Sequence, residues 1–437
     1  MLLHGNPESI VWFERPVLKH IRKKYAGQTG NYYNPKYELA KYSLDRLPIT
    51  YVSHHHSHAA AGFYTSGYQN ASVLVVDAIG EWNSVSIWNA DSNGLKCVWT
   101  KKYPHSMGLF YTAFTDYLGL KPNEEEYILM GMAAYGRPLL TDILKEEFFK
   151  DFSCPNFKLR HNLHRGCKWW ELPNQFSKFD LAASVQEIME EYLIKSTQWM
   201  SNKLPSKNLI LMGGCALNCV ANSKIAQTGK WENIWIMPNP GDAGSAIGAV
   251  AAHTNTHLNW RGPFLGTDIN RELDIDNIIK DLLDGKVVGI ANGRAEFGPR
   301  ALGNRSLICD PRGPDAKQRI NQIKKREQFR PFAPAILEEF ANEYFEMPVP
   351  TSPYMQFVAR CKKISEVPGV CHVDNTSRVQ TVGKDDNPNF RKLLEKWYDV
   401  SGCPILMNTS LNIKGEPLVN DWADAQKWER INNIKVY

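Results

Sequence analysis

The sequence lacks the features that mark membrane, secreted and nucleic-acid-binding proteins. No apolar run approaches the ~20 residues that span a bilayer, and Met1–Glu8 shows no basic segment followed by an apolar one, so we expect no signal peptide. The nine cysteines include no Cys-x-x-Cys pair, which fits reduced thiols in the cytoplasm and not a disulfide framework. A formal net charge of only +5 is too small to indicate a nucleic-acid partner. These absences predict a cytoplasmic protein without a membrane partner.

The chain has 437 residues, which is too long for one ordinary core and predicts two domains. Apolar strand-like runs alternate with helical patterns, as is typical of an α/β fold. The stretch Trp260–Gly266 is rich in glycine and proline and resembles a boundary, and Val287–Ile290 opens a second unit. We therefore predict one domain over residues 1–260 and another over residues 261–437.

Several elements of the first domain can be predicted individually. The run Ala71–Val76 predicts a buried strand, and the alternating segment Asn83–Trp88 predicts its hairpin partner. Asn208–Met212 and Ile234–Met237 predict two further strands, each running into a glycine-containing turn. Leu181–Met200 has the periodicity of a helix.

A cluster of histidines stands in the segment Tyr51–Ala61, YVSHHHSHAAA. His54 and His58 are four residues apart, so they share one face if Ser53 caps a helix. Neutral imidazoles at this spacing suit zinc or iron. The alternative is a polar helix start with solvated histidines.

Two aspartates complete a candidate metal site. Asp77 ends a buried strand, which is a common place for a ligand in an open α/β sheet, although it can equally cap a turn. Asp242 stands in Pro-Gly-Asp-Ala-Gly before an apolar helix, where it can also be a plain helix cap. Two histidines with one or two carboxylates are the ligands of open catalytic iron or zinc sites.

Two glycine turns are candidates for nucleotide binding. Each connects a strand to an apolar helical stretch, where glycine lets the backbone approach an anion and the helix start supplies free N–H groups. Neither matches a P-loop or dinucleotide fingerprint, and glycine in such turns is often only structural. The candidate residues are Gly213, Gly214, Asn218, Gly241 and Gly244.

Arginines gather in the second domain. Asn292–Gly313 resembles a loop and contains Arg294, Arg300, Arg305 and Arg312. The next basic run, Ile323–Phe332, contains Lys324 and Arg330. Guanidinium groups bind phosphate bidentately and lysine adds a point charge. A solvated helix face over residues 315–328 and a groove for RNA are the alternatives, but the interspersed glycines and prolines favour a small polyphosphate.

A polar motif follows the strand-like Pro404–Met407. Ser410 and Asn412 offer a hydroxyl and an amide that could complete the same pocket.

Nine segments together resemble one family in order and wording. They are HHHSHAA, VVDAIGEW, YILMGMAAYG, GGCALNC, PNPGDAGSAIGA, GPRALGNRSLICDPR, IKKREQFRPFAP, HVDNTSRVQTV and NTSLNIKGEP. The family is that of the O-carbamoyltransferases of the NodU/CmcH type, and the resemblance covers roughly residues 50–425.

The resemblance implies an α/β protein with an actin-like ATPase (ribonuclease-H-like) domain, N-terminally incomplete here, followed by an α/β YrdC-like domain. It also implies an ATP-dependent O-carbamoyltransferase. Carbamoyl phosphate and ATP with Mg²⁺ would form carbamoyl-adenylate in the YrdC-like domain. The first domain, with iron(II) or another divalent metal, would pass the carbamoyl group to a hydroxyl of a small acceptor.

The resemblance also implies roles for single residues. His54, His58, Asp77 and Asp242 resemble the family's metal ligands, with His54 also catalytic. Lys324 and Arg330 would be catalytic contacts of carbamoyl phosphate and ATP. The remaining candidates would bind the nucleotide: Gly213, Gly214, Asn218, Gly241, Gly244, Arg300, Arg305, Ser410 and Asn412.

The start of the chain departs from the family pattern. It opens near the family's Pro-x-x-Lys stretch, at Phe13–Lys19, without the usual first strands and a histidine that assists transfer. We expect a truncated sequence, a second chain that supplies this piece, or impaired transfer. A sheet edge would then be exposed. Ala78, Ile128 and Leu411 also replace the usual glycine, lysine and phenylalanine.

Two other functions stay open on the sequence alone. One is a tRNA-modifying threonylcarbamoyl enzyme that has the actin-like and YrdC-like folds. The low net charge argues against it, and so do the motifs, which resemble those of the family that acts on small molecules. The other is a nucleotide-binding regulatory remnant without transfer activity, against which stand the candidate ligands retained in both halves.

Overall fold

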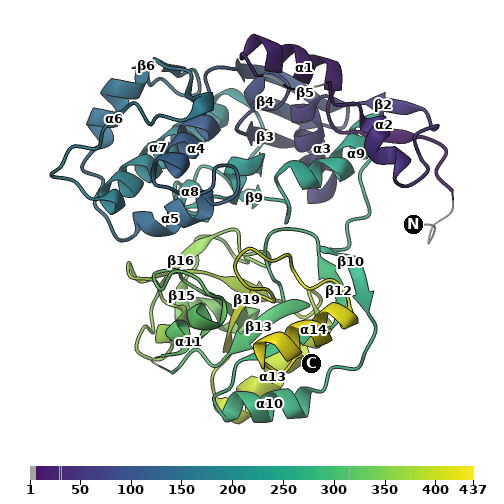
Figure 1. The fold of residues 1–437 in the computed structure, drawn as a ribbon, viewed down its shortest axis with the longest axis vertical. Coiled ribbons are helices and arrows are strands. Elements are labelled where there is room, and N and C mark those ends of the chain that lie inside the picture. The colour runs from purple at the N-terminus through teal and green to yellow at the C-terminus, as the bar shows by residue number, and fades with distance from the viewer. Residues whose placement is uncertain (1–5, 29, 31, 314) are drawn as a thin grey trace.

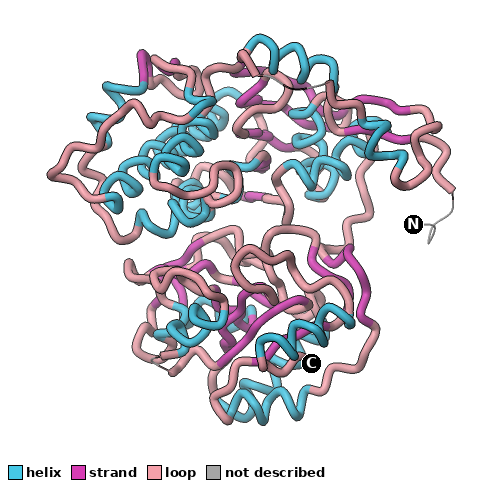
Figure 2. The backbone as a smooth tube through the Cα atoms, viewed as in Figure 1, coloured by secondary structure: helices cyan, strands magenta, loops and turns pink. Residues whose placement is uncertain are grey.

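The computed structural model describes residues 6–28, 30, 32–313 and 315–437. The first five residues, part of the segment on which we based the expectation of no signal peptide, lie outside this range. The fold is mixed α/β with several sheets. Elements from β1 to α9 gather in one half of the molecule and elements from β10 onward in the other (Figure 1), and the secondary structure alternates throughout both (Figure 2). Among the described helices, none combines the length and apolarity of a membrane span.

A five-stranded sheet, ordered β5-β4-β3-β8-β9, forms the centre of the first half. Strand β4 is antiparallel to β3 and β5, whereas β3, β8 and β9 are parallel. The strands are β3 (Ala71–Val76), β4 (Asn83–Asp91), β5 (Gly94–Lys102), β8 (Asn208–Met212) and β9 (Asn233–Trp235). The predicted strands at β3 and β8 and the hairpin with β4 are confirmed, while β9 starts one residue earlier and ends two earlier than expected.

Helices cover both faces of this sheet because successive side chains of β3 point to opposite sides. Val73 and Val75 pack with α3 and α9, whereas Leu74 and Val76 pack with α4, α5, α7 and α8. The predicted helix at 181–200 is confirmed within the longer α7. The helices are α3 (His54–Ser66), α4 (Met107–Tyr117), α5 (Glu126–Ala133), α7 (Lys178–Lys203), α8 (Cys219–Gln227) and α9 (Ser245–Thr254).

Smaller elements surround this core. A two-stranded parallel sheet, β1–β2, packs beside α9. The peripheral elements are β1 (Ile10–Trp12), α1 (Pro16–Tyr25), α2 (Pro35–Ala40), β2 (Ile49–Tyr51), α6 (Thr141–Phe148), β6 (Phe149–Asp151) and β7 (Lys158–Leu159).

The second half contains another five-stranded sheet, ordered β11-β13-β19-β14-β18, with only β14 and β18 parallel. Its strands are β11 (Val288–Ala291), β13 (Arg305–Cys309), β14 (Ala333–Leu337), β18 (Gln380–Val382) and β19 (Ile405–Ser410). Around it lie β10 (Phe264–Ile269), β12 (Gly293–Glu296), β15 (Phe345–Glu346), β16 (Val358–Cys361), β17 (Thr376–Arg378), α10 (Ile275–Leu283), α11 (Ala316–Ile323), α12 (Ala341–Tyr344), α13 (Pro388–Ser401) and α14 (Trp422–Asn432).

The structure corrects two expectations in this half. The stretch Asn292–Gly313 is not one loop, because β12 and the fully buried β13 lie within it. Leu307 and Ile308 alternate to opposite faces of the sheet, which gives the segment apolar contacts on both sides. The helix expected to reach residue 328 ends at Ile323, and Lys325 then takes a positive φ of 50°. Lys324 and Arg330 therefore stand on a turn and not on a helix face.

Candidate metal centre and cation cluster

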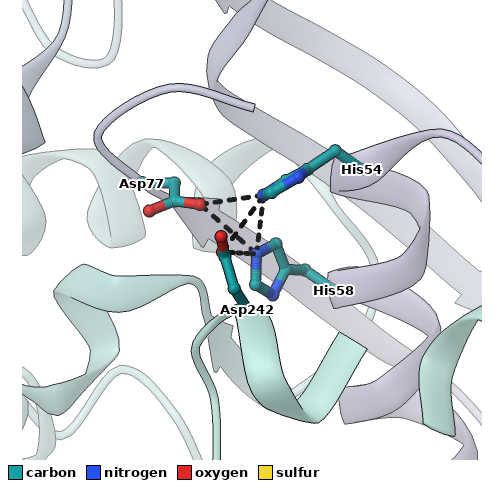
Figure 3. Close-up of side chains that lie close together, drawn as sticks. All are labelled: His54, His58, Asp77 and Asp242. Atoms are coloured by element: carbon teal, nitrogen blue, oxygen red, sulfur yellow. Dashed lines mark hydrogen bonds and ion pairs between the residues drawn. The ribbon is translucent and has the colours of Figure 1, made fainter. Parts of the chain in front are cut away.

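Four side chains converge at the end of β3 (Figure 3). Helix α3 begins at His54 with Ser53 in the N-cap position, as expected, although the Ser53 hydroxyl makes no cap bond. His54 and His58 are one turn apart on α3, and both are buried. Asp77 follows β3 directly, and Asp242 begins the short 3₁₀ turn before α9.

The ligand atoms of this group lie close to one another. Nε2 of His54 is 3.1 Å from Oδ2 of Asp77, 3.3 Å from Oδ1 of Asp242 and 3.1 Å from Nε2 of His58. Nε2 of His58 is 3.3 Å from each carboxylate. Four ligands at about 2.0 Å from one ion are about 3.3 Å apart in a tetrahedron. The spacing and the N/O donor set therefore fit a divalent metal.

Charge pairing stabilises the ionised forms of these groups. Burial alone would lower the pKa of His54, but contacts with Asp242 and Asp77 raise it well above its usual value. Burial would raise the pKa of Asp77, but the two histidines hold it well below its usual range. In the same way, the histidines lower the pKa of Asp242 to about 2 against the effect of burial. A metal ion would take the place of the protons on these imidazoles.

The glycine turns lie beside this group, and several of their residues have structural roles. Gly213 has a φ of 86°, and a Cβ there would lie 2.3 Å from the carbonyl oxygen of Val76. A Cβ on Gly244 would lie 1.9 Å from a backbone oxygen. Asn218 is buried and caps α8 by accepting from a backbone N–H. A Cβ on Gly214 would lie 3.3 Å from Oδ1 of Asp77, and one on Gly241 would meet nothing within 4 Å.

A second group, which we call the cation cluster, lies in the other half. Its members are Arg300, Lys324, Arg326, Arg330 and Arg378. Nη2 of Arg326, Nη2 of Arg330 and Nε of Arg378 are buried without a hydrogen-bond partner within the described residues. Burial and the neighbouring Arg378 lower the pKa of Arg300 to about 9. Burial, followed by Arg330, lowers the pKa of Arg326 to about 9. Nε of Arg330 pairs with Glu327 at 2.8 Å, but the unpartnered nitrogens of the three arginines favour an anion here.

Lys324 ties this cluster to the polar motif at the end of β19. Its Nζ is 2.6 Å from the Ser410 carbonyl oxygen, 3.2 Å from the Ser410 hydroxyl and 2.9 Å from both Asn412 oxygens. Burial, helped by two neighbouring arginines, lowers the pKa of Lys324 well below its usual value. The structure thus brings together the residues expected at 324, 330, 410 and 412.

Arg305 lies apart from this group. It is fully buried, and its guanidinium donates to five backbone carbonyls, those of Thr267, Asn292, Gly293, Asn304 and Asn420. Its donors are engaged within the protein, so Arg305 joins the segments around β13.

The cation cluster faces the first half. Nη1 of Arg330 is 3.4 Å from the Tyr127 hydroxyl on α5, and its guanidinium carbon is 5.3 Å from that ring. Cys219, the first residue of α8, lies close to Arg300 and Arg378. The glycine turn 213–218 leads directly to this helix. The two candidate nucleotide-binding elements, the glycine turn and the cation cluster, therefore both lie near the boundary between the halves.

Comparison with known proteins assigns the family. The model of the carbamoyltransferase N-terminus matches residues 18–251, and that of the carbamoyltransferase C-terminus matches residues 279–437. The chain therefore belongs to the carbamoyltransferase family, a family of transferase enzymes, and the expected resemblance is confirmed.

Relatives support the same assignment. An uncharacterised protein of Synechocystis is 35% identical over 95% of this chain and 77% of its own length. Nodulation protein NolO of Bradyrhizobium diazoefficiens is 34% identical over 86% of this chain and 75% of that protein. Nodulation protein NolNO of Sinorhizobium fredii is 35% identical over 86% of this chain, which spans 62% of the relative's length.

The sequence analysis missed several residues of both groups. Arg378 stands in the motif HVDNTSRVQTV, but it is far in sequence from the other cations. Arg326 stands in a basic run, and the sequence alone does not show which of its cations meet a ligand. Tyr127, Ser245 and Glu14 also stand in segments named above, but only the fold brings them to these groups.

Proposed function

We propose that the chain is an ATP-dependent O-carbamoyltransferase that works in two steps. In the first, water cleaves carbamoyl phosphate to carbamate and phosphate, and a carbamate oxygen attacks the α-phosphorus of ATP. Carbamoyl-adenylate forms and pyrophosphate leaves. In the second, the hydroxyl of a small acceptor attacks the carbamoyl carbon, loses its proton and displaces AMP.

The observation that carries the proposal is the cation cluster. Buried guanidinium nitrogens without a hydrogen-bond partner bind phosphate oxygens and offset the negative charge of phosphoryl transfer. Arg326, Arg330 and Arg378 each have a buried donor free for such a ligand within the described residues. Lys324 holds Ser410 and Asn412 in place beside them. The first step therefore belongs to this cluster, with Mg²⁺ accompanying ATP.

The candidate metal centre supports the second step. Its two histidines and two aspartates suit iron(II) or another divalent ion, which when bound polarises a carbonyl as a Lewis acid. His54 and His58 keep their Nε2 atoms directed at the carboxylates, and the surrounding helices exclude water from both imidazoles. We propose that Gly214 and Gly241 give the adenylate access beside this centre, because neither glycine is crowded by backbone atoms.

We also propose the domain architecture that the family implies. The first domain, residues 1–260, would be actin-like, and its sheet with antiparallel β5, β4 and β3 followed by parallel β8 and β9 is consistent with a ribonuclease-H-like core. The second, residues 261–437, would be YrdC-like. Neither five-stranded sheet takes strands from the other half, which supports the boundary.

The test is to incubate the purified chain with carbamoyl phosphate, ATP and Mg²⁺ and to follow pyrophosphate and carbamoyl-adenylate by mass spectrometry. Both products should appear, and Arg330→Ala should lower their rate of formation by about 10²–10³-fold because one fixed donor to the phosphates is lost. The matched control is Arg360→Ala, which removes an exposed arginine of the same half and should keep the wild-type rate. A folded wild-type chain that makes neither product would refute the proposal.

A further inference from the structure

The outer nitrogen of each candidate metal-ligating histidine faces a buried polar side chain from another segment. Nδ1 of His58 is 3.0 Å from the hydroxyl of Ser245, at the start of α9. Nδ1 of His54 is 3.7 Å from Oε2 of Glu14, in the connection between β1 and α1. This nitrogen is buried and has no hydrogen-bond partner in the described part of the chain. Glu14, only 3% exposed, therefore faces an N–H group that lacks an acceptor.

The segment that carries Glu14 is held firmly against α3. The carbonyl oxygen of Phe13 accepts a hydrogen bond of 3.1 Å from the hydroxyl of Ser57, which lies between the two histidines on α3. The ring of Phe13 packs on that of His54 with centroids 5.7 Å apart. The backbone of Trp12 accepts from Val52 just before α3. Glu14 is thus placed beside His54 by the contacts of the two residues that precede it.

A buried carboxylate needs partners, since leaving it unpaired is costly. Nζ of Lys19 supplies one, at 2.7 and 2.9 Å from the two carboxylate oxygens. Lys19 is 33% exposed, so a pair with Lys19 alone could form at the surface. The burial of Glu14 instead brings Oε2 to the inner face of the segment, where His54 lies.

We propose that Glu14 is a positioning residue that accepts the Nδ1–H of His54 and so holds this imidazole with its Nε2 lone pair directed at the candidate metal centre. A small rotation of the carboxylate brings the pair from 3.7 Å into hydrogen-bond range. Such carboxylate–histidine pairs fix the tautomer and raise the basicity of the ligand, and their loss costs about 10–100-fold in metal affinity. The inference rests on the metal centre of the proposed function.

The test measures metal binding and not turnover. The full chain is stripped with a chelator and titrated with Co²⁺ against a competing chelator, and the visible Co²⁺ spectrum is recorded. Glu14→Gln keeps the size of the side chain but removes its charge, so it should weaken Co²⁺ binding about 10–100-fold. Glu14→Asp keeps the charge, so its Co²⁺ affinity should lie between that of the wild type and that of Glu14→Gln. Thermal unfolding in chelator checks that each variant is folded.

The matched control is Glu81→Gln. Glu81 is also buried, at 6% exposed, and pairs with Arg15 in the same segment. It should keep wild-type Co²⁺ affinity. Equal weakening by Glu81→Gln and Glu14→Gln would assign the effect to packing of the segment and overturn the inference. Wild-type affinity in Glu14→Gln would overturn it as well.

Failure of the proposed function is separable from failure of this inference. Pyrophosphate formation belongs to the cation cluster in the other half, so Glu14→Gln should leave it unchanged. A wild-type chain that binds Co²⁺ but forms no pyrophosphate refutes the two-step proposal. The Co²⁺ titrations of the Glu14 variants then still test the role of Glu14. A wild-type chain that binds no Co²⁺ refutes both the metal centre and the inference.

Discussion

At the scale of single residues, chemically similar side chains have different environments. Arg330 and Arg305 are both buried arginines. Arg330 has an unpartnered guanidinium nitrogen, whereas all three guanidinium nitrogens of Arg305 donate to backbone carbonyls. Arg330 is therefore available for a ligand, whereas Arg305 stabilises the fold.

Arg305→Ala should lower the free energy of unfolding by more than about 3 kcal/mol, because five backbone carbonyls lose a fully buried donor side chain. Urea denaturation followed by fluorescence measures this. Arg294→Ala is the control, since Arg294 is exposed and donates to one carbonyl, that of Leu265. Its cost should stay below about 1 kcal/mol. Similar costs for the two variants would contradict the structural role of Arg305.

Metal binding should release protons. The pKa of His54 and that of His58 are raised by Asp242 and Asp77 against the effect of burial, so without metal both imidazoles hold protons above pH 6.5. Bound metal requires neutral imidazoles. The affinity for Co²⁺ should therefore rise with pH above 6.5 until both imidazoles are neutral, by about tenfold per unit for each proton released. His253→Gln, at an exposed site, should keep this slope. A Co²⁺ affinity that does not change with pH would contradict the prediction that both imidazoles are protonated without metal.

The same pKa shifts determine how the stability of the metal-free chain changes with pH. A raised histidine pKa contributes stability that is fully present below pH 6.5 and is lost as pH rises through the folded pKa. The depressed pKa of Asp242, about 2, contributes stability that is present above 3.8 and is lost as pH falls toward 2. Chelator-treated protein should thus be most stable between these windows in denaturation at varied pH.

At the scale of elements, the candidate metal centre depends on close packing of α3 against α9. A Cβ on Gly248 would lie 1.8 Å from the Ser57 carbonyl oxygen and 2.7 Å from the Ala61 nitrogen. Only glycine lets the two helices approach this far, and the approach brings Ser245 and Asp242 to the histidines of α3.

Gly248→Ala should cost at least about 2 kcal/mol of stability and weaken Co²⁺ binding, because α9 must move away from α3. Thermal unfolding and the Co²⁺ titration measure the two effects. Gly131→Ala is the matched control within α5, since a Cβ there meets nothing within 4 Å. It should raise stability by about 0.5–1 kcal/mol. A stable Gly248→Ala with wild-type Co²⁺ affinity would refute this dependence on packing.

At the scale of the whole molecule, the two halves share contacts next to both sites. Phe357 of the second half is 3% exposed and belongs to the large apolar cluster of the first half. The backbone N–H of Val358 donates to the Ser223 hydroxyl at 2.7 Å, and Asn222 donates to the Gln356 carbonyl. The interface thus joins α8 to β16, between the glycine turn and the cation cluster.

Phe357→Ala should reduce overall carbamoyl transfer more than pyrophosphate formation, because in the proposed two-step reaction the adenylate has to pass between the halves. Hydrogen exchange should increase in α8 and β16 together. Phe345→Ala creates a cavity of similar size inside the second half alone, with a comparable loss of about 3–5 kcal/mol. If Phe345→Ala separated the two activities as strongly, the interface would not be the cause.

The sequence by itself determined the strands Ala71–Val76 and Asn208–Met212 and the pairing of His54 with His58. Apolar runs and a spacing of four residues are local patterns, and local patterns suffice for them. Tertiary structure alone decided that Glu14 faces His54, that Arg378 joins Arg326, and that Arg305 binds backbone while Arg330 does not. These outcomes depend on which distant segments the fold brings together, and the same side chain serves a ligand or the backbone according to its neighbours.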